Sequence, residues 1–127
     1  MPIFVVHKHF ATNLHYDFRL EMPKIGQEKH ILKSWAVPKG PPEEPGIKRL
    51  AMLVDDHELE YANFEGVIPE GHYGAGKVEI WDQGTYELEH LSENDIKFTL
   101  KGKKLTGSFA LFHPKTFKEN QWLFIKH

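Results

Sequence analysis

Residues 14–21, with the sequence LHYDFRLE, constrain the fold more than any other part of the chain. Apolar and polar side chains alternate strictly through this segment, which is the pattern of a β-strand, where successive side chains point to opposite faces of the sheet. The segment is therefore predicted to be a strand with one apolar face for a core. Its other face carries His15, Asp17 and Arg19.

The rest of the chain has the same character. Short segments rich in Val, Ile, Phe, Tyr and Trp are separated by Gly, Pro, Asn and Asp, and few stretches have a helical period. The predicted strands are residues 3–6, 14–21, 34–37, 50–55, 61–65, 76–81, 84–89, 97–100, 107–112 and 121–125. So many strands in 127 residues bury their apolar faces best in a barrel or a sandwich. We expect a mainly β fold, a compact single-domain β-barrel over residues 1–127 with a polar interior that holds the active site.

Composition and charge exclude several classes of protein. The chain has no cysteine, so any metal must be held by His, Asp or Glu. The net charge of -2 argues against a protein that neutralises many DNA phosphates, so contact with nucleic acid is expected at a short stretch or an end. No run approaches the roughly 20 apolar residues of a membrane span, and no signal peptide precedes the first strand. A cytoplasmic protein that does not bind membranes is expected.

The polar face of residues 14–21 has the residue types of a metal site. His15 and Asp17 share that face about 7 Å apart at their Cα atoms, a spacing at which both can reach one ion. His9 lies just before the turn-forming segment FATN and is a candidate third ligand. Arg19 follows on the same face, and its planar set of donors suits an anionic ligand such as phosphate. For His15 and Asp17 alone, the alternative is the solvent-facing side of an ordinary strand.

A second polar cluster, DDHELEY, follows the apolar segment LAMLV. His57 and Tyr61 in this cluster are residue types that transfer protons or bind an oxyanion near neutral pH. Taken alone, the cluster is more simply explained as a capping Asp55, a surface histidine and a tyrosine at the edge of the core. Lys39 and Arg49, which lie between the two clusters, would on their own be regarded as solvated side chains.

Two other kinds of site fit the sequence less well. GHYGAGKV has the spacing of a phosphate-binding loop, but Val78 stands where Ser or Thr is required and a strand follows instead of a helix. His15, Asp17 and the distant His57 form the ligand set of a non-haem iron oxygenase, although no arginine follows His57 to bind the carboxylate of 2-oxoglutarate. An iron oxygenase stays an alternative, as does a non-catalytic barrel that binds DNA ends or a repair protein.

Three motifs, taken in order, resemble one known family. They are H-x5-H-x-D-x-R from His9 to Arg19, SWAVPKGP from Ser34, and D-H-x-x-x-Y-x-x-F-E-G from Asp56. The chain resembles the 3'-phosphoesterase domain of bacterial end-joining DNA ligase D, in the stand-alone version known from archaea. The resemblance implies a compact β-barrel enzyme that uses manganese. Such an enzyme removes a 3'-terminal ribonucleoside and then the 3'-phosphate, which leaves the 3'-OH needed for repair synthesis or ligation.

The resemblance also implies roles for individual residues. The metal ligands for Mn²⁺, or another divalent transition metal, would be His9, His15 and Asp17. The phosphate-binding residues would be Arg19, Lys39, Arg49 and His57, and the catalytic residues would be His57, Arg19 and Tyr61. His7 lies outside the motif and is not assigned to the site.

Substrates and partners follow from the same resemblance. The expected substrates are DNA 3' ends, in the form of a primer-template that ends in a 3'-ribonucleotide or a 3'-phosphate. A separate DNA ligase and polymerase would act with the protein, which is expected to be a monomer. The segment PKIGQEKHI is longer than the usual turn between FRLE and LKSW, and it is expected to extend a hairpin over the substrate.

Overall fold

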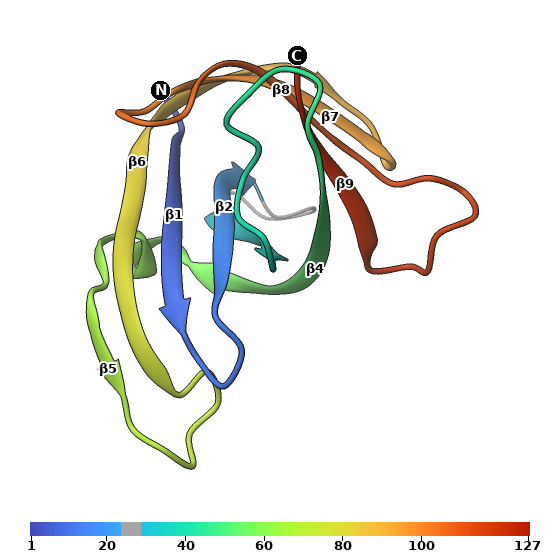
Figure 1. Ribbon diagram of the computed structural model, residues 1–127. Coiled ribbons are helices and arrows are strands. Elements are labelled where there is room, and N and C mark those ends of the chain that lie inside the picture. Colours follow the sequence, from blue (N-terminus) through green and yellow to red (C-terminus); the bar gives the residue numbers. More distant parts are fainter. Residues whose placement is uncertain (24–28) are drawn as a thin grey trace.

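The predicted strands pair into a closed antiparallel barrel in a computed structural model, which describes residues 1–23 and 29–127 (Figure 1). The expected extension of the hairpin by PKIGQEKHI falls largely on residues 24–28, which lie outside the described residues. The elements are β1 (Ile3–Phe10), β2 (His15–Pro23), β3 (His30–Val37), β4 (Lys48–Glu58), the 3-10 helix η1 (Leu59–Asn63), β5 (Gly66–Ile68), β6 (Gly76–Leu91), β7 (Asp95–Lys101), β8 (Thr106–Phe112) and β9 (Gln121–Lys126).

The order of strands around the barrel is β1-β2-β3-β4-β9-β8-β7-β6, and the pairing of β6 with β1 closes it. The short strand β5 pairs with the start of β6 and extends the sheet beyond the barrel. In Figure 1, the β1–β2 hairpin and the connection between β5 and β6 both project below the barrel. Among the described residues there is no helix of the length and apolar character that a membrane crossing requires.

The long strand β6 replaces two predicted strands. The sequence predicts strands at 76–81 and 84–89 with a turn between them, and this prediction is wrong. One strand forms because residues 77–85 pair with β1 while residues 85–91 pair with β7. Gly84 lies where the partner changes, and a Cβ atom at this position would collide with the carbonyl group of Lys101.

The segment 61–65 was also predicted as a strand and instead begins within η1. Tyr61 and Phe64 stack with ring centroids 5.0 Å apart and planes inclined by 12°. A separation of three residues aligns side chains in a 3-10 helix, so this stack favours η1 over an extended chain. Ala62 of η1 belongs to a small apolar cluster with Leu32 of β3, which holds the helix on the sheet.

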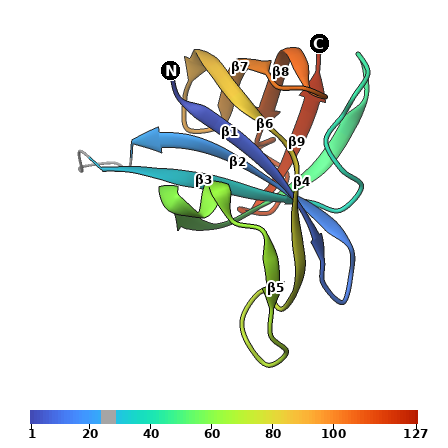
Figure 2. The ribbon, with the colours of Figure 1, turned by 90° about the vertical axis from the view of Figure 1, so that its left-hand side faces the viewer.

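The interior of the barrel is apolar and aromatic. Phe18 of β2 has its ring centroid 4.5 Å from that of Phe124 and 5.8 Å from that of Phe98, and the buried cluster around them includes side chains from all eight barrel strands. The mainly β barrel is therefore confirmed, but its interior is not polar. The polar side chains expected there lie on the opposite face of the same strands, because side chains alternate between the faces. Figure 2 shows η1 and β5 on that outer side of β1–β3, away from β7–β9.

A buried carboxylate holds the turn between β7 and β8 against β6. Asp82 is only 3% exposed and accepts hydrogen bonds from the backbone N–H groups of Lys103 at 2.9 Å, Lys104 at 3.1 Å and Leu105 at 2.8 Å. Buried backbone donors need such partners, since an unpaired one loses its hydrogen bond to water without replacement. Asp82 thus fixes one end of the barrel.

We expect Asp82→Ala to lower the free energy of unfolding by about 1–3 kcal/mol, because it leaves the buried N–H group of Leu105 unpaired and removes the acceptor of two partly buried N–H groups. Urea unfolding followed by circular dichroism measures the change. The control Glu87→Ala removes only an exposed ion pair with Lys101, at 2.9 Å, and should cost less than about 1 kcal/mol. Equal losses in the two variants would contradict the anchoring role of Asp82.

Candidate metal and phosphate site

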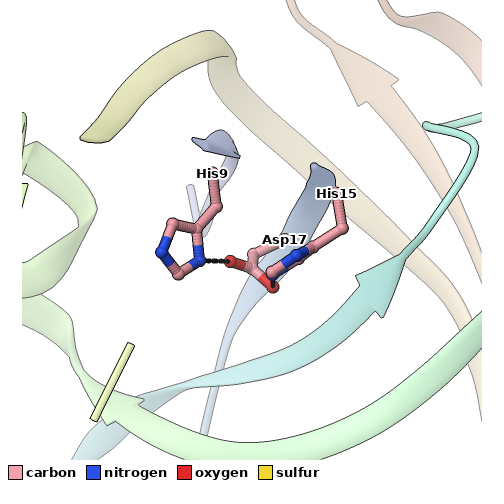
Figure 3. Close-up of side chains that lie close together, drawn as sticks. All are labelled: His9, His15 and Asp17. Atoms are coloured by element: carbon pink, nitrogen blue, oxygen red, sulfur yellow. Dashed lines mark ion pairs between the residues drawn. The ribbon is translucent and has the colours of Figure 1, made fainter. Parts of the chain in front are cut away.

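Two histidines and an aspartate meet where β1 ends and β2 begins. The strand register places His9 opposite His15, and Asp17 follows two residues along β2. One potential ligand atom of each residue lies within 4.8 Å of the other two. The distance is 3.2 Å between His15 Nε2 and Asp17 Oδ1 and 3.6 Å between His9 Nδ1 and Asp17 Oδ2 (Figure 3). The fold therefore brings together the three residues predicted as metal ligands.

Backbone carbonyl groups determine which ring nitrogen of each histidine faces this group. His9 Nε2 donates to the carbonyl of Ala75 at 3.0 Å, and His15 Nδ1 donates to that of Asn13 at 3.0 Å. A neutral imidazole that donates through one nitrogen carries a lone pair on the other. His9 Nδ1 and His15 Nε2 are therefore the available ligand atoms, and metal-binding histidines are commonly oriented by such carbonyl groups.

The charge of Asp17 is stabilised by its neighbours. The side chain is largely buried, and burial opposes its ionisation, but the hydrogen bond from His15 and the charge of Arg19 outweigh burial and lower the pKa of Asp17. The same hydrogen bond raises the pKa of His15, against the effect of burial. A bound divalent ion would stabilise the carboxylate in the same way and would compete with the proton on His15.

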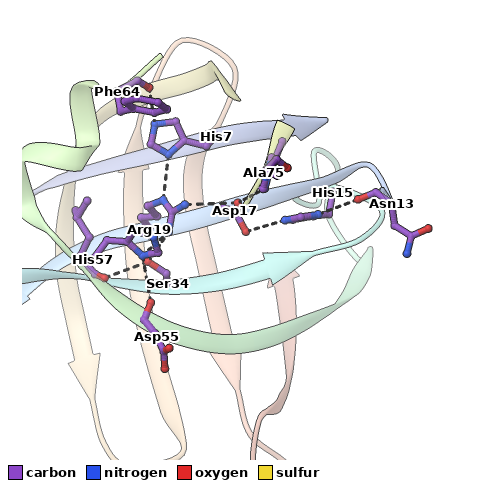
Figure 4. A network of polar contacts seen from close by, with 12 residues as sticks. His7, Asn13, His15, Asp17, Arg19, Ser34, Asp55, His57, Phe64 and Ala75 are labelled. Atoms are coloured by element: carbon purple, nitrogen blue, oxygen red, sulfur yellow. Dashed lines mark hydrogen bonds and ion pairs between the residues drawn. The ribbon is translucent and has the colours of Figure 1, made fainter. Parts of the chain in front are cut away.

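Arg19 lies at the centre of a buried polar network (Figure 4). Its side chain is almost fully buried; Nε donates to His7 Nδ1 at 3.0 Å and Nη1 donates to Ser34 Oγ at 2.9 Å. Nη1 also donates to His57 Nδ1 at 3.1 Å, and Nη2 lies 3.5 Å from Asp17 Oδ2. Hydrogen bonds to these described partners engage three of the five guanidinium hydrogens, while Nη2 makes only the ion pair with Asp17 and can donate to a ligand. Burial lowers the pKa of Arg19, but a guanidinium stays charged in proteins.

His7 is a member of this network that the sequence motif does not include. Its side chain has no exposed surface; Nδ1 accepts from Arg19, and Nε2 donates to the carbonyl of Phe64 at 3.1 Å. Burial, followed by the charge of Arg19, lowers the pKa of His7 to about 4, so the imidazole is neutral at pH 7. His7 thus orients the guanidinium of Arg19. The sequence does contain one indication that His7 belongs to the site: it lies two residues before His9 and therefore on the same face of the strand.

A β-bulge in β4 brings His57 into the site. Pairing with β3 joins Val54 to Ser34 but His57 to Leu32, so β4 has one extra residue over this stretch. The extra residue reverses the alternation of side chains. His57 therefore shares the face of Val54, which lines the site, and not that of Ala51, which belongs to the core.

The contact with Arg19 also determines the protonation of His57. Arginine can only donate, so Nδ1 of His57 accepts and the proton of the neutral ring is on Nε2. The carbonyl of Asp55 lies 3.2 Å from the same nitrogen, but the contact with a charged donor is the stronger one. Burial, followed by the charge of Arg19, lowers the pKa of His57. The Nε2–H group of a neutral His57 is suited to bind an anion.

Tyr61 covers the network from η1. Its ring centroid is 5.0 Å from the guanidinium carbon of Arg19 and 4.7 Å from the ring centroid of His57. Burial raises the pKa of Tyr61, so the phenol keeps its proton and can donate it in a hydrogen bond. The structure therefore brings together Arg19, His57 and Tyr61, the residues predicted to be catalytic.

All these groups line or adjoin one pocket of about 680 Å³, whose rim is formed by residues 11–13 of the β1–β2 hairpin and residues 72–75. Lys39 and Arg49, predicted to bind phosphate, are not among the described residues that line it. Lys39 is exposed just after β3. Arg49 shares a face with Ala51, because β4 alternates regularly before the bulge, and Ala51 points into the core. The pocket thus offers an anion one permanent positive charge from its described lining, that of Arg19.

Comparison with known proteins agrees with this geometry. Residues 7–113 match the family of the DNA Ligase D 3'-phosphoesterase domain. The chain is 47% identical to the multifunctional non-homologous end joining protein LigD of Pseudomonas aeruginosa, over 97% of this chain and 15% of that protein. It is 46% identical to LigD of Mycobacterium bovis, over 85% of this chain and 14% of that protein. It is 42% identical to LigD of Mycolicibacterium smegmatis, over 88% of this chain and 15% of that protein. The chain therefore spans about 15% of the length of these curated relatives.

Removal of one ligand should abolish tight metal binding. We expect isothermal titration calorimetry to show one Mn²⁺ site, with the affinity of His15→Ala weaker by at least about 100-fold, since loss of a ligand should exceed the 10–100-fold cost of losing an outer contact. Affinity should also fall as the pH drops below about 7, because the raised pKa of His15 lets a proton compete with the metal. His30→Ala, which removes an exposed histidine paired with Glu21, should bind like wild type. Unchanged affinity in His15→Ala would refute the assignment.

The buried neutral His7 should make stability depend on pH. Its pKa is about 4 in the folded protein and ordinarily 6.5, so in this range the unfolded chain binds a proton that the folded protein does not. The free energy of unfolding should therefore fall as the pH decreases from 6.5 to about 4, by up to about 3 kcal/mol from this group. His7→Gln can make both hydrogen bonds without titrating and should show a shallower decrease. Urea unfolding at about pH 7 and about pH 4.5 compares the two proteins, and equal decreases would contradict this role.

Proposed function

Because the chain belongs to the family of DNA ligase D 3'-phosphoesterase domains, we propose that it is a metal-dependent enzyme that hydrolyses phosphate esters at the 3' ends of DNA. Two reactions are proposed in sequence. Removal of a 3'-terminal ribonucleoside leaves a 3'-phosphate, and hydrolysis of that phosphate leaves a 3'-OH. The second reaction needs the smaller set of contacts, because only a terminal phosphate must enter the pocket.

One observation carries the proposal: the metal-ligand group and Arg19 share a carboxylate. Oδ1 of Asp17 approaches His15, while Oδ2 approaches both His9 and Arg19. Without a ligand, the charges of Asp17 and Arg19 cancel. A divalent ion on the histidine side would add two positive charges next to the available N–H of Arg19. A buried site with that charge is best neutralised by a dianion, and the terminal phosphate of a DNA strand is one.

The side chains of the pocket provide hydrogen-bond donors for such a phosphate. We propose that the Nη2–H of Arg19 and the Nε2–H of His57 bind its non-bridging oxygens, with the O–H of Tyr61 beside them. Donors held in place before the reaction stabilise the charge that develops as the ester bond breaks. His57 is also placed to donate a hydrogen bond from Nε2 to the departing 3'-oxygen. Neither His57 nor Arg19 gives up a proton in this role, because the only proton of a neutral imidazole is too weakly acidic to transfer and a guanidinium stays protonated.

The metal would be held by His9 Nδ1, His15 Nε2 and Asp17. Two imidazoles and a carboxylate suit a divalent transition metal, and we propose Mn²⁺. Such an ion polarises phosphoryl oxygens and lowers the pKa of bound water. The contribution of the chain is to set the tautomers: the carbonyl groups of Ala75 and Asn13 accept from His9 Nε2 and His15 Nδ1, so that each neutral imidazole directs its lone pair toward the ion.

The remaining contacts and partners are proposed on the same basis. A net charge of -2 favours a grip on the end of a strand over one along a duplex. Since Lys39 is exposed and does not line the pocket, we propose it as a contact to a phosphate farther along the strand, whereas Arg49, on the core face of β4, is not proposed as such a contact. A 3'-OH is the group that a DNA polymerase extends and a ligase joins, so these enzymes are the proposed partners. We propose that the protein acts with them in the cytoplasm as a monomer.

The test uses a primer-template that ends either in a 3'-phosphate or in a single 3'-ribonucleotide, with Mn²⁺, Mg²⁺ or a chelator. We expect phosphate release from the first substrate, and a shortened strand with a 3'-phosphate from the second, only with a metal. Arg19→Lys should lower kcat/KM by about 100-fold or more, because a lysine keeps the charge but cannot maintain the donor geometry. Lys97→Ala, at an exposed position of β7, serves as the control.

Other outcomes would point elsewhere. Ends that stay unchanged with every metal would refute the enzyme proposal. Iron-dependent consumption of oxygen without phosphate release would support the iron oxygenase alternative. Tight binding of 3' ends without turnover would support a non-catalytic end-binding barrel.

A further inference from the structure

The most exposed large hydrophobic side chain among the described residues lies at the rim of the pocket. Tyr73 is 84% exposed, and it also lines the pocket that contains the metal-ligand group and Arg19. It takes no part in the network around Arg19 described above. An aromatic ring left in water costs free energy that burial would recover, so a ligand that covers this ring while it occupies the pocket would gain stability from the contact.

The position of Tyr73 is set by the backbone of its loop. Residues 69–75 connect β5 to β6, and two turn hydrogen bonds shape them, from His72 N to the carbonyl of Pro69 at 3.3 Å and from Ala75 N to the carbonyl of His72 at 3.2 Å. The carbonyl of Ala75 accepts from His9 Nε2 at 3.0 Å. The loop that presents Tyr73 is therefore attached directly to a predicted metal ligand, which fixes the backbone of the loop relative to the metal side of the pocket.

Gly74, next to Tyr73, shows why the loop keeps this form. Its φ of 75° lies in the left-handed region, which a glycine adopts without strain. The turn therefore directs the tyrosine outward. The loop sequence PEGHYGA contains no Lys or Arg, so this side of the rim offers a flat ring and no permanent positive charge.

The opposite side of the rim is the turn of the β1–β2 hairpin, residues 11–13. The two segments project from the barrel in the same direction (Figure 1). Tyr73 and Arg19 line the same pocket, so a small anion bound by Arg19 would have its remaining substituent in the pocket whose rim carries the ring.

We infer that Tyr73 stacks on the nucleobase that adjoins the phosphate bound in the pocket, an inference that rests on the proposed function. On a DNA strand, the groups next to a terminal phosphate are a sugar and a base, and each base has a flat π face. Stacking on an exposed aromatic side chain is the interaction that proteins use to hold single-stranded ends without reading their sequence. Arg19 would hold the 3'-terminal phosphate, and Tyr73 would stack on the base of the nucleotide that carries this phosphate.

The experiment combines a change in the protein with a change in the DNA. Tyr73→Ala, Tyr73→Trp and wild type each hydrolyse, with Mn²⁺, two strands with a 3'-phosphate: one with a normal terminal nucleotide and one whose terminal nucleotide lacks its base. For Tyr73→Ala we expect KM to rise about 10-fold on the normal strand, as 1.4 kcal/mol of stacking implies, and less than about 2-fold on the strand without the base. Tyr73→Trp should keep the wild-type KM on both, and kcat should change little.

A second readout needs no catalysis. A strand with 2-aminopurine as its terminal base is titrated with each protein in the presence of a chelator, and stacking changes its fluorescence. The change should be seen with wild type and with Tyr73→Trp and be lost with Tyr73→Ala. Phe112→Ala, which removes an exposed ring from β8 outside the pocket, is the control and should behave like wild type.

The outcomes separate this inference from the proposed function. If wild type hydrolyses the normal strand and Tyr73→Ala has the same KM, the stacking role is refuted while the proposed function stands. Equal losses by Tyr73→Ala on both strands would also refute it, because the ring would then act on the phosphate step. If wild type hydrolyses neither strand but the fluorescence change depends on Tyr73, the proposed function fails and base stacking stands.

Discussion

The burial of the Arg19 guanidinium is the constraint on which the site depends. A positive charge removed from water is tolerated only when its hydrogens meet acceptors and a negative charge lies nearby. Asp17 supplies the charge, while His7, Ser34 and His57 supply acceptors. Each requirement then fixes a second property: Asp17 stays ionised, and His7 and His57 stay neutral with known tautomers. A phosphate bound as proposed would therefore meet donors that are already oriented, which is how a buried polar site stabilises developing charge.

The features that could be predicted from the sequence are those that depend on one strand. The alternation in LHYDFRLE is a property of β2 alone, and it correctly separates Phe18, which enters the core, from Asp17 and Arg19, which do not. His9 could be added because a short turn returns the chain beside itself and places it opposite His15. The aromatic and β-branched segments likewise indicated a barrel, because so many short strands have few other ways to bury one face.

The features that could not be predicted depend on pairing between strands. The bulge in β4 has no signature in the residues around Asp55, yet it decides that His57 faces the site and that Arg49, on the regular part of the same strand, does not. The pattern of a single strand also could not predict whether the site lies inside the barrel or on its outer face. Alternation shows that two faces differ, but only the closure of the barrel shows that the apolar one is inside. His7 was missed because its role is to bind Arg19, and motif spacing does not reveal such a contact.

Because the site lies on the outer face, the residues of a strand that stabilise the core differ from the residues of the same strand that form the site. Residue 18 of β2 packs among Phe98 and Phe124, and a change there acts on the folded state as a whole. Its neighbours at 17 and 19 make hydrogen bonds and ion pairs on the other face, where Arg19 also lies over the ring of Tyr61, under the cover of η1 and the loop that follows β5. The cover is built from short irregular segments and not from barrel strands, so its residues can change without opening the core. If the protein acts on 3' ends as proposed, the part of the molecule best suited to adapt to different ends is therefore the rim around Arg19 and not the barrel that supports it.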